Sequence, residues 1–558
     1  MSGVTDTLKT LDMYNSELTT LTWPTNKTKV STMNLAGTKI QELSFNNTVP
    51  YLETLTIGSD YLESFEFIAG DSSSLGNITI MPNNGLKSFI VKDDNYFISV
   101  QSIDLSGCDV LETVVINGCS SLMRLSLPTT TPIKSLDLTG CSSMDTVGTG
   151  ATSAIERLTI GNTGITTIDL GEFPALKYLD ASSDFGGLSG ELVISGHSAI
   201  ETIDLSGTEV SKVTINNTDT FLTLEASDCT KLNELNISGC VNITSLDVSS
   251  LPNLEILNIN GCTGITSLDL SSANNLIRLD IGGTGITSID LSGCGELLDF
   301  FASGSSLTGD LDYTYLTNLS RIDLSNSTGV TSLDVSNIST LHYLILSGCS
   351  GVTTLNTTGC TGLWEVVING TQISTVSMTN YTSLMSIEAA GCTKLTSIDV
   401  TGCTEFAWVV LEGCTALQSL KLNGCTKIRT LDMSGYNELN SLTYLDVRNN
   451  SNLTELYLSA LTELTTVDVD MSDNLTYIDI SNTKLSAFDS SAMSNVKMFM
   501  CMYATNLTSI SLGNATNLST LNVTGCSSTL NIDLSESSAL YGDYANSIIG
   551  YVDTMTVN

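Results

Sequence analysis

The chain has 558 residues and a formal net charge of −38 at pH 7, from 59 acidic and 21 basic side chains. This charge repels phosphate, so the sequence argues against nucleic acid and anionic lipid as partners. No run of 18 apolar residues occurs, and we expect no membrane insertion. Residues 1–6 carry neither a basic nor an apolar signal segment, so we expect no secretory signal there.

One short phrase recurs along nearly the whole chain. Clear copies are Ile-Asp-Leu-Ser-Gly-Cys at 103–108 and 289–294, and Leu-Asp-Leu-Thr-Gly-Cys at 136–141. A looser pattern, L-x-x-L-x-L, returns roughly every 11 residues, and pairs of it return every 21 or 22 residues. Fixed periods of this size are typical of solenoids, in which each turn packs on its neighbours.

The alternation within L-x-x-L-x-L predicts a short strand whose leucines face inward and whose flanking residues face outward. Two series of such strands interleave, with one member of each per turn. The first series opens at Leu254, Leu276, Leu297, Leu319, Leu341, Leu363, Leu384, Phe406 and Ile428. The second series opens at Ile243, Ile265, Ile286, Val330, Val352, Ile373, Leu395 and Leu417. The sequence therefore predicts a mostly β repeat solenoid, an arc or rod of about 26 short turns with two strand-like segments per turn and little or no helix.

We expect one solenoid over residues 1–537, with irregular turns near 58–100, 140–155 and 434–445. Residues 538–558 depart from the repeat and gather aromatic and aliphatic side chains, so we interpret them as the C-terminal cap. A solenoid needs such caps because its terminal core layer is otherwise bare. No comparable N-terminal cap is visible, which predicts that this edge docks on another chain or domain.

Fifteen cysteines occur, and thirteen of them follow a glycine directly after the strand phrase. They follow the repeat and form no C-x-x-C pair, so neither a zinc knuckle nor a disulfide framework is predicted. We interpret them as small buried groups stacked at the bend after a strand. Free thiols in this number favour assembly in a reducing compartment. The sequence predicts no metal site and no cofactor.

The repeat resembles a leucine-rich repeat of the bacterial 21/22-residue nested type, called IRREKO-like, written LxxLxLxxNxLxxLDLxxN. Residues 276–281, Leu-Ile-Arg-Leu-Asp-Ile, match its first half, and residues 286–291, Ile-Thr-Ser-Ile-Asp-Leu, match its second. Cysteine often replaces the asparagine here, and many turns have 22 residues. The resemblance covers most of the chain and points to surface proteins of Bacteroides and their phages. It implies a non-enzymatic protein that recognises its ligand through a concave sheet formed by the first half-repeat.

The two series differ in their outward residues. The second series repeats aspartate, at Asp247, Asp269, Asp290, Asp312 and Asp334. The first series is varied and rich in arginine and aromatic residues, which are typical of interface hot spots. The predicted ligand-binding residues of the concave face are Arg278, Phe301, Arg321, Tyr343, Ile345, Glu365, Val367, Trp408, Val410, Tyr457 and Tyr477.

Five of these residues are expected to be neighbours on about four adjacent turns. They are Tyr343, Ile345, Val367, Trp408 and Val410. A contiguous exposed apolar patch favours a contact surface. The alternative is a ladder of aromatic side chains that serves to stabilise the sheet.

The aspartate row also has two interpretations. Carboxylates about 5 Å apart repel one another unless they are solvated or bridged by a cation. Calcium could bridge them, but the sequence lacks GGxGxD and DxDxDG loops, so we predict a solvated acidic stripe. The two histidines, His197 and His342, lie far apart, and no G-x-S-x-G, P-loop or HExxH motif occurs. We therefore predict no catalytic residues and no enzyme.

The sequence predicts a recognition module presented on a surface, namely a phage virion protein of the tail that binds a receptor on a bacterial host. Its expected partners are a protein or a cell-surface glycan, with other virion proteins docked at the N-terminal edge. The expected location is the virion, assembled in the host cytoplasm. One alternative is a structural spacer or assembly component of a virion. Another is a secreted or cell-surface bacterial adhesin, if the chain is a fragment of a longer protein.

Overall fold

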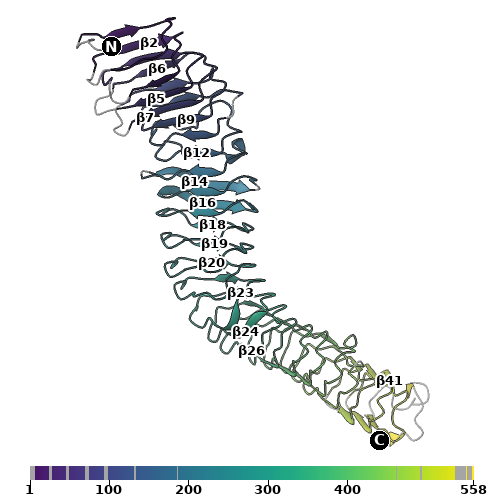
Figure 1. Cartoon of the computed structure of the whole chain (residues 1–558). Coiled ribbons are helices and arrows are strands. Elements are labelled where there is room, and N and C mark those ends of the chain that lie inside the picture. Colours follow the sequence, from purple (N-terminus) through teal and green to yellow (C-terminus); the bar gives the residue numbers. More distant parts are fainter. Residues whose placement is uncertain are drawn as a thin grey trace. The chain divides into compact units, whose positions relative to one another are not determined.

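The computed structural model describes residues 7–23, 28–45, 49–69, 74–93, 98–130, 133–184, 186–195, 197–459, 461–490, 493–513, 515–534, 548–549 and 556–557. The chain divides into two compact units, Met1–Leu276 and Ile277–Asn558. Each unit is a parallel β-solenoid built on the L-x-x-L-x-L repeat (Figure 1). The described residues form about 23 turns, fewer than the predicted 26. Some turns are longer than the 21- or 22-residue repeat. Ser419, for example, pairs with Tyr444, 25 positions later.

Unit 1 contains the first-series strands β1 (Thr10–Asp12), β2 (Thr32–Ala36), β4 (Thr54–Gly58), β6 (Asn77–Ile80), β8 (Ser102–Asp104), β10 (Arg124–Ser126), β14 (Gly186–Ser195), β16 (Thr208–Asn216), β18 (Glu234–Asn236) and β19 (Ile256–Asn258). The second series forms one nine-stranded sheet, β3 (Glu42–Ser44), β5 (Ser64–Ile68), β7 (Ser88–Lys92), β9 (Thr113–Asn117), β11 (Ser135–Asp137), β12 (Arg157–Thr159), β13 (Tyr178–Asp180), β15 (Thr202–Asp204) and β17 (Thr223–Glu225). A single 3-10 turn, η1 (Leu170–Glu172), is the helical element of the described residues.

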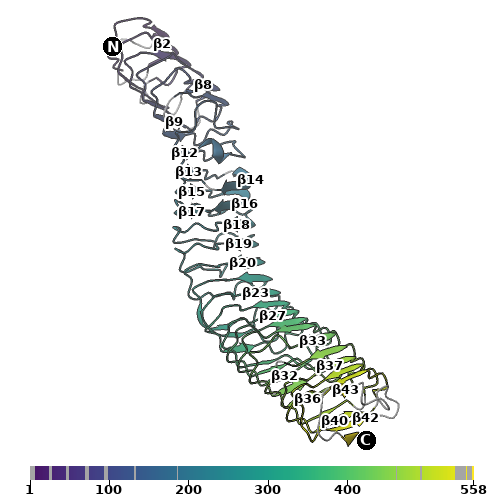
Figure 2. The ribbon, with the colours of Figure 1, turned by 90° about the vertical axis from the view of Figure 1, so that its right-hand side faces the viewer.

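In unit 2 the first-series strands β20 (Arg278–Asp280), β21 (Asp299–Phe301), β23 (Arg321–Asp323), β25 (Tyr343–Ile345), β27 (Glu365–Val367), β29 (Ser386–Glu388) and β31 (Trp408–Val410) pair in this order. We call these seven strands the first-series sheet. A separate sheet contains β33 (Thr430–Asp432), β35 (Glu455–Tyr457), β37 (Tyr477–Asp479), β39 (Met498–Met500), β41 (Thr520–Asn522) and β43 (Ile548–Ile549) (Figure 2).

The second series of unit 2 forms three sheets. The first contains β22 (Thr308–Asp312), β24 (Gly329–Asp334) and β26 (Thr354–Asn356). The next contains β28 (Thr375–Ser377), β30 (Ser397–Asp399), β32 (Ser419–Lys421), β34 (Tyr444–Asp446) and β36 (Thr466–Asp468). The last contains β38 (Ala487–Asp489), β40 (Ser509–Leu512), β42 (Asn531–Leu534) and β44 (Thr556–Val557).

The prediction of a second-series strand is wrong in three turns. The segments that open at Ile243, Ile265 and Ile286 lie within the described residues and form no strand. Their isoleucines are fully buried, so packing of the side chain into the core holds these segments where a strand ladder does not. The predicted cap at 538–558 lies outside the described residues, apart from β43 and β44. Among the described residues, no helix has the length and apolar character needed to cross a membrane.

The core beneath the first-series sheet is formed by the middle residue of each strand. Each three-residue strand turns its middle residue inward, and Leu279, Phe300, Leu344 and Val366 are each 0% exposed. Burial of one such side chain contributes roughly 2 kcal/mol of stability. The residues on either side of it face outward, so successive turns place them in rows about 4.8 Å apart.

The cysteines stack inside the solenoid, which confirms the interpretation of them as buried groups. Fourteen of the fifteen are buried, and all fifteen are free. Eleven of the fifteen thiols donate to a carbonyl of the preceding turn, as Cys403 does to Met378 O at 2.9 Å and Cys414 to Ala389 O at 3.0 Å. Burial raises the pKa of Cys403 to about 11 and that of Cys414 to about 12. These thiols are therefore protonated at neutral pH.

This ladder predicts a strong selectivity in thiol chemistry. At pH 8 in the folded protein, iodoacetamide is expected to modify Cys526 first, because it is the one cysteine that is not fully buried. A hydrogen bond with Cys501 also lowers the pKa of Cys526, and thiolate is the reactive form. Peptide mass spectrometry measures the modification at each site. Equal rates at Cys526 and at Cys403 or Cys414 would contradict the ladder.

Candidate binding surface

The outward residues of the first-series sheet form two rows that run from turn to turn. One row contains Arg278, Asp299, Arg321, Tyr343, Glu365, Ser386 and Trp408. The other contains Asp280, Phe301, Asp323, Ile345, Val367, Glu388 and Val410. The sheet thus brings together nine of the eleven residues predicted from the sequence. The other two, Tyr457 and Tyr477, lie on the separate sheet, where their ring centroids are 4.7 Å apart.

Arginine and aromatic side chains alternate along one end of this sheet. The Cζ atom of Arg278 lies 4.7 Å from the Phe301 ring centroid, and that of Arg321 lies 5.3 Å from the same centroid. Arg321 also lies 5.6 Å from the Tyr343 ring. The Tyr343 ring meets Trp364 edge-on at 5.7 Å. We call Arg278, Phe301, Arg321, Tyr343 and Trp364 the arginine–aromatic array.

A third row, of exposed and half-buried side chains, lies one residue before each strand. It contains Ile277, Leu298, Ser320, His342, Trp364, Met385 and Ala407, and each backbone N–H from Leu298 onward donates to the carbonyl of the preceding member. Leu298 is 41% exposed, Trp364 38% and Met385 43%. We call this the edge row. Sequence reasoning missed it because it considered the two positions that flank the central leucine, although the signal is visible in pairs such as Leu363-Trp364 and Leu384-Met385.

The predicted five-residue apolar patch is interrupted. Ile345 and Val367 are direct partners in register, but Glu388 separates Val367 from Val410. Val367 is 8% exposed, so the prediction that it presents a solvent-exposed contact is wrong. Valine is short, and the longer side chains of Ile345 and Glu388 flank it in the row. Trp408, by contrast, is 52% exposed, so its side chain is available for contact with a partner.

The polar groups near the array do not form a catalytic constellation. Ser320 Oγ lies 2.9 Å from His342 Nδ1, and the imidazole lies against Trp364 with ring centroids 4.3 Å apart. No carboxylate contacts the other ring nitrogen among the described residues, so the dyad lacks the third group that orients a catalytic histidine.

The aspartates of the second series have a structural task. The Oδ1 atom of Asp247 accepts the N–H of Ser249 at 2.8 Å, and Asp290 and Asp334 do the same for Ser292 and Ser336. Such side-chain-to-backbone hydrogen bonds stabilise the turn that follows the strand phrase. Hydrogen bonds from Ser249 lower the pKa of Asp247, which therefore stays ionised at neutral pH. In the described part of the chain no group of three potential ligand residues could hold a metal ion.

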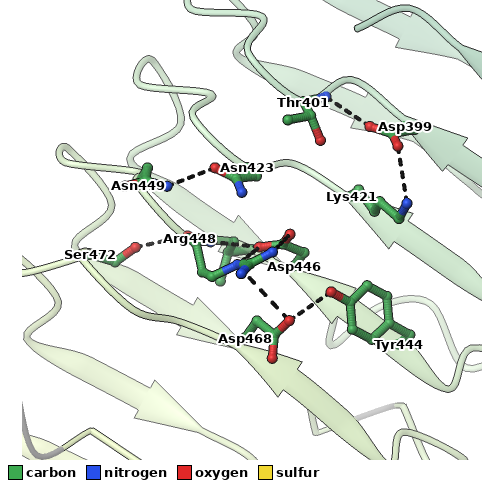
Figure 3. A network of polar contacts seen from close by, with 11 residues as sticks. Asp399, Thr401, Lys421, Asn423, Tyr444, Asp446, Arg448, Asn449, Asp468 and Ser472 are labelled. Atoms are coloured by element: carbon green, nitrogen blue, oxygen red, sulfur yellow. Dashed lines mark hydrogen bonds and ion pairs between the residues drawn. The ribbon is translucent and has the colours of Figure 1, made fainter.

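Further along the second series, lysine and arginine side chains pair with aspartates of the row (Figure 3). Lys421 lies 3.2 Å from Asp399. Arg448 donates Nη2 to Asp446 Oδ2 at 2.7 Å and Nε to Asp446 Oδ1 at 3.0 Å. Tyr444 donates to Asp468 at 2.6 Å, and this hydrogen bond, together with burial, raises the pKa of Tyr444 to about 12. Lys421, Arg448 and Tyr444 are therefore each paired with an aspartate of the same stretch.

No family model matches the sequence, and no curated protein matches it. Among solved structures, the chain is similar to the functional domain of InlJ from Listeria monocytogenes, which includes a cysteine ladder, at 18% identity, with 76% of this chain and 74% of that one covered and a TM-score of 0.31. It is also similar to the plant peptide hormone receptor RGFR1 in complex with RGF2, at 13% identity, 95% coverage of both chains and a TM-score of 0.29. A leucine-rich-repeat protein of Leptospira interrogans is 12% identical over 93% of this chain and 91% of that one, with a TM-score of 0.19. These values are too low to place the chain in a family or to transfer a ligand to it.

Proposed function

We propose that the protein is a non-enzymatic recognition module that binds a partner on a cell surface through the first-series sheet. One observation carries the proposal, the concentration of exposed apolar side chains on this sheet. Of the eight exposed large hydrophobic residues described in unit 2, five belong to the edge row or the strands beside it: Ile277, Leu298, Trp364, Met385 and Trp408. Exposed apolar groups gathered in this way, with arginine and tyrosine among them, are typical of protein interfaces.

A loss of binding in two variants tests this proposal. Tyr343→Ala and Trp408→Ala are each expected to weaken binding of the labelled chain to bacterial cells of the Bacteroides kind by roughly tenfold or more, because anchors of this type dominate interface energies. Flow cytometry with the labelled chain measures the binding. Tyr315→Ala is the matched control, since Tyr315 is 45% exposed but lies outside the first-series sheet. Unchanged binding in both anchor variants would exclude this sheet as the contact surface.

We further propose that the repeat is of the IRREKO-like type and that the module is carried on a phage virion, as part of the tail. The free, buried thiols support this location, because proteins assembled in a reducing cytoplasm keep their cysteines reduced. Peptide mass spectrometry of fractions from the source culture tests it. Peptides of this chain in purified particles would support the virion, whereas their recovery in envelope or secreted fractions would favour a bacterial adhesin.

A further inference from the structure

We propose that the arginine–aromatic array binds an acidic peptide segment of the partner protein, with Arg278 and Arg321 as the carboxylate-binding residues. The proposal rests on the recognition function above and adds the chemistry of the ligand. It depends on four properties of the array: the unpaired state of its arginines, their orientation, their spacing and the apolar row beside them.

The two arginines are unpaired in a strongly acidic chain. Of the seven other basic side chains of unit 2, four form ion pairs with nearby acids: Lys421 with Asp399, Lys427 with Glu405, Arg448 with Asp446 and Lys484 with Glu463. The other three, Lys394, Arg429 and Lys497, form no ion pair within the described residues, but they lie outside the first-series sheet. Within the described residues, neither Arg278 nor Arg321 has an ion pair or a side-chain hydrogen bond. The Nε atom of Arg321 is moreover buried without a partner. A buried donor of this kind is costly unless a ligand satisfies it.

The arginines turn away from the carboxylate that the register offers them. Asp299 lies between Arg278 and Arg321 in the same row, one turn from each. Both guanidinium groups nevertheless lie over the Phe301 ring. A guanidinium held over the ring in this way has no carboxylate partner among the described residues, and its Nη donors can bind a carboxylate of a ligand in a bidentate manner.

The spacing of the arginines matches an extended peptide. Arg278 and Arg321 are two turns apart, which is about 10 Å at the usual distance between parallel strands. In a polyproline II peptide, residues i and i+3 lie on one face about 9 Å apart. A peptide that crosses the strands can therefore place acidic side chains at i and i+3 on the two arginines.

The edge row favours a peptide over an acidic glycan. Ile277, Leu298 and Met385 offer exposed apolar surface. Covering this surface with apolar side chains of a bound peptide is favourable. A sugar ring stacks on aromatic faces but gains little from such aliphatic groups. Nucleic acid is disfavoured by the net charge of −38.

Selection of displayed random 12-residue peptides on the intact chain tests the proposal. We expect the selected peptides to be enriched in Asp or Glu at positions three apart, flanked by apolar residues. With one labelled selected peptide, Arg278→Gln and Arg321→Gln are expected to weaken binding roughly tenfold or more, as measured by fluorescence anisotropy. Arg321→Lys should also weaken it, because an ammonium keeps the charge but loses the planar fork.

The matched control is Arg157→Gln. Arg157 lies 4.8 Å over the Tyr178 ring in unit 1, so it shares the stacked geometry but lies outside the array. Circular dichroism establishes that each variant is folded.

The proposal is overturned if no peptide is selected, if the selected peptides lack acidic residues, or if Arg157→Gln weakens binding as much as the array variants do. Binding of an oligogalacturonide without selection of any acidic peptide would assign the array to a glycan instead. If Tyr343→Ala and Trp408→Ala abolish cell binding while the arginine variants retain it, the recognition function stands and this inference fails.

Discussion

Replacing Gly118 with alanine is expected to destabilise the turns around β9 by about 4 kcal/mol, the largest effect of a single methyl group that we expect in unit 1. Gly118 occupies the corner directly after β9 with φ +75°, a left-handed conformation that costs other residues roughly 1 kcal/mol. Its N–H donates to Thr139 O at 2.7 Å, which holds the corner against the next turn. An added Cβ would overlap the carbonyl oxygen of Asp93 and lie 2.7 Å from its carbonyl carbon. Because the obstacle is backbone, no rotamer change relieves the overlap.

Gly190→Ala separates the two causes. Gly190 has φ +72°, but no atom lies within 4 Å of the position where its Cβ would be. This substitution should therefore cost only the conformational part, about 1 kcal/mol. Hydrogen–deuterium exchange of the amides in β9, β11, β14 and β16 measures local opening free energies in the full chain. If Gly118→Ala and Gly190→Ala lost equal amounts of opening free energy, the close approach of the Asp93 backbone to Gly118 would contribute nothing to the effect.

Replacing Arg448 with alanine is expected to cost about 2 kcal/mol in the stability of unit 2 at pH 7. Asp446 is 2% exposed, so the variant leaves its carboxylate buried with much of its hydrogen bonding lost (Figure 3). Losing a partner in a fully buried pair costs more, but the Arg448 side chain is 40% exposed and solvent screens part of the interaction. Lys421→Ala is the matched control, because its pair with Asp399 is more exposed and should contribute less than about 1 kcal/mol. Urea unfolding followed by circular dichroism gives both values.

The same pair predicts how the loss depends on pH. Burial acts to raise the pKa of Asp446, but the hydrogen bonds and charge of Arg448 outweigh it and hold the pKa below the usual 3.8. A carboxyl with a lowered pKa stabilises the fold above about pH 4 and loses that contribution as the pH falls through its folded pKa. Without Arg448, burial is expected to raise the pKa of Asp446, and protonation then relieves the buried charge. The difference between the wild-type chain and Arg448→Ala should therefore shrink below pH 4, and a difference that grows there would contradict this account.

The sequence predicted those features that a repeat imposes on every turn. The inward positions of Leu279 and Leu344 follow from strand alternation, and so does the outward position of Trp408. Residues outside the strand do not obey that alternation, which explains why Trp364 was missed. Exposure is set by neighbours on other turns, so Val367 could not be recognised as covered. The strand expected after Ile243 fails although its pattern is intact, because pairing also requires a partner segment with matching backbone hydrogen bonds.

The aspartate row shows a second limit of the sequence. The repeat revealed that aspartate recurs, and repulsion between like charges suggested a solvated stripe or a cation. The structure adds that Asp290 and Asp334 each accept the N–H of the residue two positions later. That hydrogen bond gives each carboxylate a local partner, and a cation is not needed to explain the row. The stacking of Arg278 and Arg321 on Phe301 was likewise beyond the sequence, because it depends on side-chain directions across three turns.

The most direct test of the recognition surface is hydroxyl-radical footprinting of the labelled chain, free and bound to host cells, read out by peptide mass spectrometry. The proposed function predicts that oxidation of Trp364, Met385 and Trp408 slows several-fold on binding. It also predicts that Met471 and Tyr503, which are 67% and 59% exposed elsewhere in unit 2, keep their rates. Protection of Met471 or Tyr503 with unchanged oxidation of the two tryptophans would contradict the assignment of the first-series sheet as the binding surface.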